Sequence, residues 1–243
     1  MLAQIRQALA RPGTSGANLG AMPPELPIGR MLGVMPPIAP EELLPKFEAE
    51  LAKVSGVAHR VSSLEQLDEV LRGILTAAKA ESVILSRNPL LPQLKLGDRM
   101  RAMGITVTEW PTAGEPSMEV QAAYRAACFS AAVGITGADW ALAETGSLVV
   151  TSQTEGSQLA SLAPPVHIAL YTPEQLVESL DDILERLPLA QNPLDPAAGR
   201  SVVFVTGVSR TADIEQILIR GVHGPRELHA VLIESACLSS APK

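Results

Sequence analysis

The sequence predicts a layered α/β protein with a mainly parallel sheet and helices on both faces. Three observations lead to this fold class. Short apolar runs of strand length alternate with longer segments whose apolar residues recur at helical spacing, which is typical of parallel strands joined by helices. The 243 residues can bury a sizeable core, as one large domain or two small ones. The chain is 47% hydrophobic but only 3% aromatic, so we expect an aliphatic core.

The predicted elements of the first half follow a β-α-β-α rhythm. Apolar residues three and four positions apart predict helices at 40–54, 63–80, 91–103 and 117–127. Compact apolar runs predict strands at 57–61, 82–86 and 105–110.

The second half repeats the alternation. We expect strands at 166–171, 201–205 and 228–233. Thr172 and Pro173 predict the start of a helix that continues to Leu184, because Thr suits the cap and Pro the first helical position. A further helix is expected beyond Asp213, ended by Gly221.

The chain divides into three predicted parts. Residues 1–40 form an amphipathic start and an arm, since residues 11–40 contain seven prolines and five glycines. The arm could lie over its own domain or over a neighbouring subunit. Residues 41–234 form the α/β domain, and residues 235–243 are a tail.

Composition and charge exclude several classes of function. A formal charge of −7 without a basic stripe argues against nucleic acid as a partner. No apolar run approaches the roughly 18 residues that span a bilayer, and the start lacks a secretion signal, so we expect a cytoplasmic location. Cys128 and Cys237 cannot supply four thiolates, so we expect no metal or iron–sulfur cofactor in this chain. Cys128 fits a buried structural thiol.

The stretch from Ala131 to Ser152 carries the first candidate chemistry. Two apolar runs of strand length flank a short segment that contains Asp139 and Glu144. Ligands of open α/β sheets bind at the ends of strands, so these carboxylates are candidates for acid–base work. The same residues also fit a plainer role, in which Asp139 caps a short helix and Glu144 lies in a solvated turn.

The turn from Gly207 to Asp213 is the second candidate. A glycine turn that leads into a helix N-terminus directs free backbone N–H groups at an anion, and Ser209, Arg210 and Thr211 could add donors. The alternative is that the hydroxyls cap the helix and that Asp213 pairs with Arg210.

Two histidines differ in their surroundings. The loop at His223 to Arg226 supplies a second guanidinium and a histidine that we expect to be exposed. His167 stands inside an apolar run, which favours a core histidine with one hydrogen bond over a catalytic role.

Short catalytic motifs do not identify a reaction. The sequence has no HExxH, no P-loop, no GxGxxG fingerprint and no GxSxG elbow.

Four blocks together resemble the lactate-utilisation (LUD) domain family. They are GITGADWALAETGS from Gly134, LASLAPPVHI from Leu159, GVSRTADIE from Gly207 and GVHGPRELH from Gly221. The resemblance covers Ala39 to Ile233, in the family's order, and is to members that carry no iron–sulfur region.

The resemblance implies a fold similar to the NagB/RpiA/CoA-transferase-like group. It implies participation in oxidising L-lactate to pyruvate, beside iron–sulfur A and B partner proteins that carry the redox cofactor. By analogy with that fold group, Glu144 and Asp139 would be the acid–base residues. The anion-binding residues would be Gly137, Thr145, Gly146, Gly207, Ser209, Arg210, Thr211, His223 and Arg226.

Three functions therefore stay open at this stage. The chain could be a subunit of a lactate-oxidising assembly that binds a small anionic metabolite. It could be an independent enzyme that acts on a phosphosugar or an acyl-CoA. It could also be a non-catalytic assembly or regulatory subunit.

Overall fold

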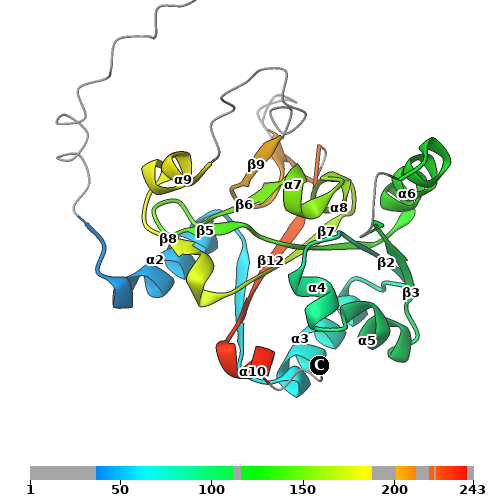
Figure 1. The fold of residues 1–243 in the computed structure, drawn as a ribbon, viewed down its shortest axis with the longest axis horizontal. Coiled ribbons are helices and arrows are strands. Elements are labelled where there is room, and N and C mark those ends of the chain that lie inside the picture. Colours follow the sequence, from blue (N-terminus) through cyan, green and yellow to red (C-terminus); the bar gives the residue numbers. More distant parts are fainter. Residues whose placement is uncertain (1–36, 112–115, 188–200, 212–218, 222, 240–243) are drawn as a thin grey trace, which may run out of the picture. The chain divides into compact units, whose positions relative to one another are not determined.

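A six-stranded parallel sheet forms the centre of the protein (Figure 1). The computed structural model describes residues 37–111, 116–187, 201–211, 219–221 and 223–239. The strands, in spatial order, are β1 (Val57–Val61), β12 (Glu227–Ile233), β7 (Val166–Tyr171), β4 (Val133–Gly137), β2 (Ser82–Leu85) and β3 (Thr106–Glu109). All five neighbouring pairs run parallel, as the alternating pattern predicts.

Helices cover both faces of this sheet. The face that carries Val133 and Ile135 packs against α3 (Leu64–Ala77), α4 (Leu90–Gln93) and α5 (Leu96–Ala102). The opposite face packs against α2 (Pro40–Lys53), α6 (Met118–Ser130) and α8 (Leu159–Leu162). The expected α/β architecture is therefore confirmed, and the core is largely aliphatic.

A smaller four-stranded sheet lies beyond the second face. Its order is β8 (Leu176–Val177), β5 (Trp140–Leu142), β6 (Ser147–Thr151) and β9 (Val202–Val205). β5 and β6 form an antiparallel hairpin. The remaining short elements are α7 (Ser152–Glu155), η2 (Pro173–Gln175), α9 (Leu180–Arg186), β10 (Arg210–Thr211), β11 (Ile219–Arg220) and α10 (Ser235–Ser239).

Two expectations about local structure are wrong. The segment from Asp139 to Glu144 is a strand and a turn, not a helix, because Trp140 to Leu142 pair with both β6 and β8. The helix predicted from Thr172 to Leu184 ends after one 3₁₀ turn at Gln175, although its capping box is present. Strand pairing of Leu176 and Val177 with β5 overrides the helical periodicity there.

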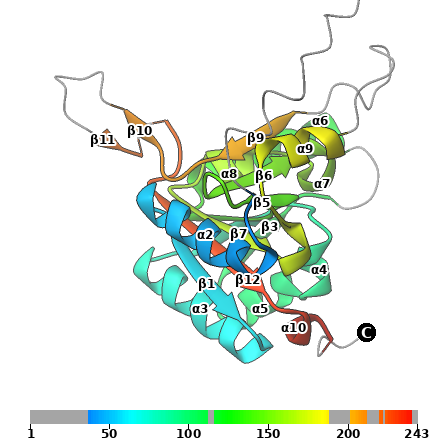
Figure 2. The same ribbon diagram turned by 90° about the vertical axis from the view of Figure 1, so that its left-hand side faces the viewer.

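The helix expected beyond Asp213 falls on residues 212–218, outside the described part of the chain. On either side of that gap the chain forms an antiparallel ribbon, β10 with β11, which Figure 2 shows standing away from the sheet. Gly221 therefore follows a strand, and Arg210 lies in a strand. The predicted helix at 91–103 is interrupted at Lys95, whose φ of 51° is left-handed. Most of the predicted arm also lies outside the described residues.

The strand order creates a switch point between β2 and β4. From β2 the chain crosses through α4 and α5 on one face to reach β3, whereas from β4 it crosses through β5, β6, α7 and α8 on the other face to reach β7 (Figure 1). Connections that leave neighbouring strands in opposite directions open a crevice at the carboxyl ends of those strands, where ligands of open α/β sheets bind. None of the helices among the described residues is long and apolar enough to cross a membrane.

Candidate functional site

Three polar side chains meet at the switch point. Asn88 follows β2, Asp139 follows β4, and Glu155 ends α7, so each comes from a different segment of the chain. We call these three residues the carboxyl-edge cluster, because they lie where the parallel strands end.

Asn88 holds the cluster together. Its Nδ2 donates to Oε1 of Glu155 at 2.5 Å, and its Oδ1 accepts the main-chain N–H of Leu90 at 3.0 Å. Gly137, the last residue of β4, makes this possible, because a Cβ at that position would overlap the amide group of Asn88. Gly137, predicted as an anion-binding residue, therefore admits the Asn88 side chain at the end of β4.

Asp139 is half-buried and accepts two hydrogen bonds through Oδ2. The donors are the main-chain N–H of Thr151 at 2.7 Å and the hydroxyl of Thr154 at 2.9 Å. Burial raises the pKa of this carboxyl, and the bonds from Thr154 and Thr151 oppose the rise. The carboxylate is thus held in place by β6 and α7, with Oδ2 already occupied.

Glu155 is the most deeply buried acid of the cluster. Its side chain is 0% exposed, and Oε2 has no hydrogen-bond partner of normal geometry among the described residues. Burial raises the pKa of Glu155 to about 7, and the charge of Asp139 adds to the rise, while Ser86, Asn88 and the Gly137 amide oppose it. The hydroxyl of Thr154 also stands 3.4 Å from Oε1, so the two carboxyl groups share one neighbour.

Trp110 brings a second unpartnered polar atom to this edge. It follows β3, its main-chain N–H donates to Leu85, and its ring packs edge-on against Tyr124 with centroids 4.9 Å apart. Its buried Nε1 has no acceptor among the residues described. The indole lies against Gly156, the residue after Glu155, where a φ of 74° and the absence of a Cβ admit the ring.

The other predicted anion-binding residues gather at the amino edge, where the parallel strands begin. Gly207 packs against Val54, just before β1, and Val208 donates to the Val54 carbonyl. Arg210 is exposed and donates to the hydroxyl of Ser55 at 2.6 Å.

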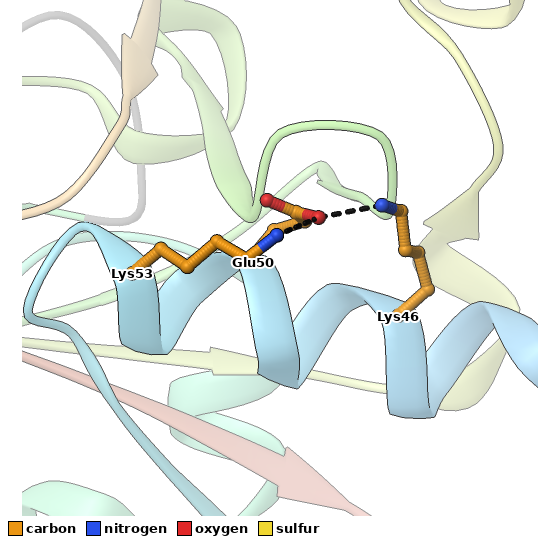
Figure 3. A network of polar contacts seen from close by, with 3 residues as sticks. All are labelled: Lys46, Glu50 and Lys53. Atoms are coloured by element: carbon orange, nitrogen blue, oxygen red, sulfur yellow. Dashed lines mark hydrogen bonds and ion pairs between the residues drawn. The ribbon is translucent and has the colours of Figure 1, made fainter.

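The tip of the β5–β6 hairpin lies at the same end of α2. Gly146 packs directly on the backbone of Glu50 and Leu51, and Figure 3 shows the loop passing over the helix where Glu50 joins Lys46 and Lys53. Thr145 continues this contact through a chain of hydroxyls. Its Oγ1 stands 2.7 Å from Ser147 Oγ, which stands 2.7 Å from Thr206 Oγ1.

Glu144 and Asp139 do not share a site. Asp139 precedes β5 and faces Thr151, whereas Glu144 follows β5 and its Oε2 accepts the N–H of Leu180 at 3.3 Å. They stand at opposite ends of the hairpin, and an extended strand of four to five residues spans roughly 13–16 Å. Glu144 belongs with Gly146 at the α2 end, so the structure pairs Asp139 with Glu155 instead.

Ser209, His223 and Arg226 lie around the base of the ribbon. The N–H of Ser209 donates to Pro225, and the N–H of Arg226 donates to Pro165, just before β7. His223 and Arg226 are exposed. Thr211 is a strand residue of β10.

His167 has the surroundings expected of a core histidine. It is fully buried and its Nε2 lies 2.8 Å from the hydroxyl of Thr136. Burial lowers its pKa to about 3. Among the described residues no three His, Cys, Asp or Glu side chains are grouped so that they could hold a metal ion.

Sequence reasoning missed Asn88, Glu155 and Trp110. In the sequence, Asn88 and Pro89 indicate only a break between a strand and a helix. Glu155 stands in the polar run QTEGSQ, which predicts a turn. Only the strand order places them beside Asp139. A usable signal was that Asn88 lies three residues after the end of a buried strand and Asp139 two residues after another.

The LUD domain family matches residues 44–233, which is most of the chain. The protein belongs to the LUD domain family.

Relatives within this family are similar over most of their length. "Lactate utilization protein C" of Halalkalibacterium halodurans is 25% identical over 224 residues, which cover 91% of this chain and 92% of the relative. The protein of the same name from an Exiguobacterium species is 32% identical over 197 residues, covering 79% of this chain and 78% of the relative. A crystal structure of a DUF162 family protein from Deinococcus radiodurans matches 81% of this chain and 99% of its own, with a TM-score of 0.55 and 22% identity, and so supports the fold.

Proposed function

We propose that this LUD protein is the component without an iron–sulfur cluster of a bacterial L-lactate utilisation system, which oxidises L-lactate to pyruvate. We further propose that it binds a small anionic metabolite at the carboxyl edge. Relatives that match most of the chain are named lactate utilization protein C, which supports the role. The convergence of Asn88, Asp139 and Glu155 at the switch point is the observation that supports the location.

The chemistry of the cluster suits a site that holds or moves a proton. Two neighbouring carboxyl groups in a poorly solvated place favour a state in which one is ionised and the other is protonated. Asp139 takes the ionised role, because two donors already stabilise its charge. Glu155 takes the protonated role, because it is fully buried.

Electron transfer belongs to partner proteins in this proposal. The A- and B-type iron–sulfur subunits of the system would carry the redox cofactor, and this chain would contribute ligand binding and proton handling. Its two cysteines lie in separate elements, Cys128 in α6 and Cys237 in α10, and both are buried.

Growth on L-lactate tests the role. A strain that lacks this gene should fail to grow on L-lactate as the carbon source, and a plasmid copy of the wild type should restore growth. The chain should also co-purify with an iron–sulfur protein from lactate-grown cells. Normal growth of the deletion strain on L-lactate would refute the role. For the glutamate variants described below, the matched control is Glu69→Gln, an exposed change on α3.

A second candidate is an independent enzyme on a phosphosugar or an acyl-CoA. The pairing of Asp139 with Glu155 around Thr154 favours it, since such a pair can act as acid and base without a partner. Turnover by the purified chain alone would support this candidate over the first.

A further inference from the structure

Two buried polar atoms at the carboxyl edge have unused hydrogen-bonding capacity. They are Oε2 of Glu155 and Nε1 of Trp110, and neither has a hydrogen-bond partner of normal geometry among the described residues. The Ser86 hydroxyl and the Gly137 N–H lie close enough to Glu155 to oppose the rise of its pKa. Most buried polar groups are hydrogen-bonded, and leaving one unpaired is unfavourable. The Trp110 indole packs on Gly156, the residue after Glu155, and Tyr124 lies near both side chains.

The contacts of Asn88 decide where a proton on Glu155 would lie. Oε1 accepts the Asn88 amide, so a protonated carboxyl carries its hydrogen on Oε2. Oε2 is then a donor, as the indole Nε1 always is. Two donors that lack acceptors call for a ligand with two acceptor oxygens.

We propose that Glu155, as a neutral acid, and Trp110 donate hydrogen bonds to the oxygens of a small 2-oxo or 2-hydroxy acid bound at the carboxyl edge. The acid class depends on the proposed lactate role, whereas the two donors depend only on the geometry. A carboxylate with an adjacent carbonyl or hydroxyl offers acceptor oxygens a few ångströms apart. A ligand hydroxyl, if present, can donate to the Asp139 carboxylate.

The charged and titratable groups around Glu155 are compatible with one bound anion. Asp139 is the neighbouring carboxylate, and Tyr124 approaches from α6. Arg87 lies beside the cluster, where its main-chain N–H donates to the Glu155 carbonyl and its guanidinium to the Gln153 carbonyl. Ionised Glu155 would repel an anion, so binding requires the acid form.

Calorimetric titration of the full chain with pyruvate and L-lactate at pH 6 and pH 8 tests this. Both ligands are fully ionised across that range, so a change in Kd reports the protein. With a Glu155 pKa of about 7, the dissociation constant should rise about tenfold from pH 6 to pH 8. Acetate, which lacks the second oxygen-bearing carbon, should bind more weakly than pyruvate.

Two variants separate the donors from general damage. Glu155→Gln keeps an acceptor for Asn88 and a donor in the Oε2 position, so it should bind pyruvate with the same Kd at both pH values. Trp110→Phe keeps most of the packing but removes one donor, and should weaken binding about two- to tenfold. Glu69→Gln should keep the tenfold pH dependence.

Each contrary result has a defined meaning. The inference is overturned if the wild type binds neither acid at pH 6, if its Kd is the same at both pH values, or if Glu155→Gln keeps the pH dependence. Loss of growth on L-lactate after gene deletion would still support the proposed function in those cases. Binding as described, with normal growth of the deletion strain, would instead refute the function and keep the site.

Discussion

The two edges of the parallel sheet hold polar residues in opposite ways. At the amino edge, Arg210 and Arg226 are exposed, and their charges face solvent. At the carboxyl edge, Asn88 and Glu155 are buried and bonded to each other. Charges in solvent interact weakly and add little to stability, whereas a buried acid changes its protonation state. We therefore place the proposed ligand site at the carboxyl edge, which has fewer exposed charges.

The largest expected effect on stability comes from a buried pair, His167 and Thr136, on adjacent strands of the parallel sheet. His167, the second residue of β7, contacts Thr136, which precedes Gly137 on β4. Its pKa falls from 6.5 to about 3 on folding, so the unfolded chain binds the proton first and stability declines as the pH falls from 6.5 towards 3. The decline amounts to at most about 5 kcal/mol.

Urea unfolding at pH 7, 6, 5 and 4 measures that decline. His167→Gln should remove roughly half of it, leaving a similar part from His229, whose pKa is lowered to about 4. An equally steep acid loss in the variant would contradict the assignment.

Glu155 should show the opposite dependence on pH. Its folded pKa of about 7 lies above the unfolded value of 4.5, so the folded state holds the proton more tightly. This contribution to stability is complete below pH 4.5 and is lost as the pH rises through 7, by up to about 3 kcal/mol. Glu155→Gln should therefore match the wild type at pH 4.5 and exceed its stability at pH 8.

Glu144→Gln is the matched comparison at the hairpin tip. Glu144 is only partly buried, and its carboxylate accepts one bond from Leu180. At pH 8 this variant should lose no more than about 1 kcal/mol, because it loses a single partly exposed hydrogen bond. A gain at pH 8 in Glu144→Gln but not in Glu155→Gln would reverse the comparison of the edges.

Gly137→Ala should have a medium effect. The new methyl group would overlap the Asn88 side chain, which is buried and bonded to Glu155, and such overpacking costs about 2 kcal/mol. Gly73→Ala on α3 is the control, because no atom lies within 4 Å of the added Cβ, and it should gain about 0.5–1 kcal/mol. Denaturant midpoints of the two variants should move in opposite directions, and equal shifts would mean that Gly137 has no special contact.

Arg210→Ala should have the smallest effect. Its guanidinium is exposed and bonded to Ser55, so we expect less than about 0.5 kcal/mol of lost stability and a less than twofold change in the Kd for pyruvate. Calorimetry measures the second quantity. A loss of pyruvate binding would move the anion site to Arg210, which sequence reasoning predicted as an anion-binding residue.

Sequence reasoning reached the fold but only part of the site. Every strand of the six-stranded sheet was predicted, since buried parallel strands are compact apolar runs such as Val166 to Tyr171. Short elements failed where tertiary pairing overrode local periodicity, as at Leu176 and Val177. Asp139 was predicted at a strand end and lies there.

The rest of the site depends on long-range contacts that leave no local pattern. Glu155 is 67 residues from Asn88, and nothing near either residue in the sequence indicates that both are buried. The shared acid–base role of Asp139 and Glu144 was predicted from their positions at strand ends and from analogy with the related fold group. Strand β5 lies between the two residues, and an extended strand holds its ends further apart than a turn would.

The most direct test of the central claim follows the Glu155 carboxyl itself. A ¹³C NMR pH titration of the glutamate δ-carbons, assigned by comparison with Glu155→Gln, should show one resonance with a midpoint of about 7 that moves higher in saturating pyruvate. A midpoint near 4.5 that pyruvate leaves unchanged would contradict a proton-bearing ligand site at the carboxyl edge.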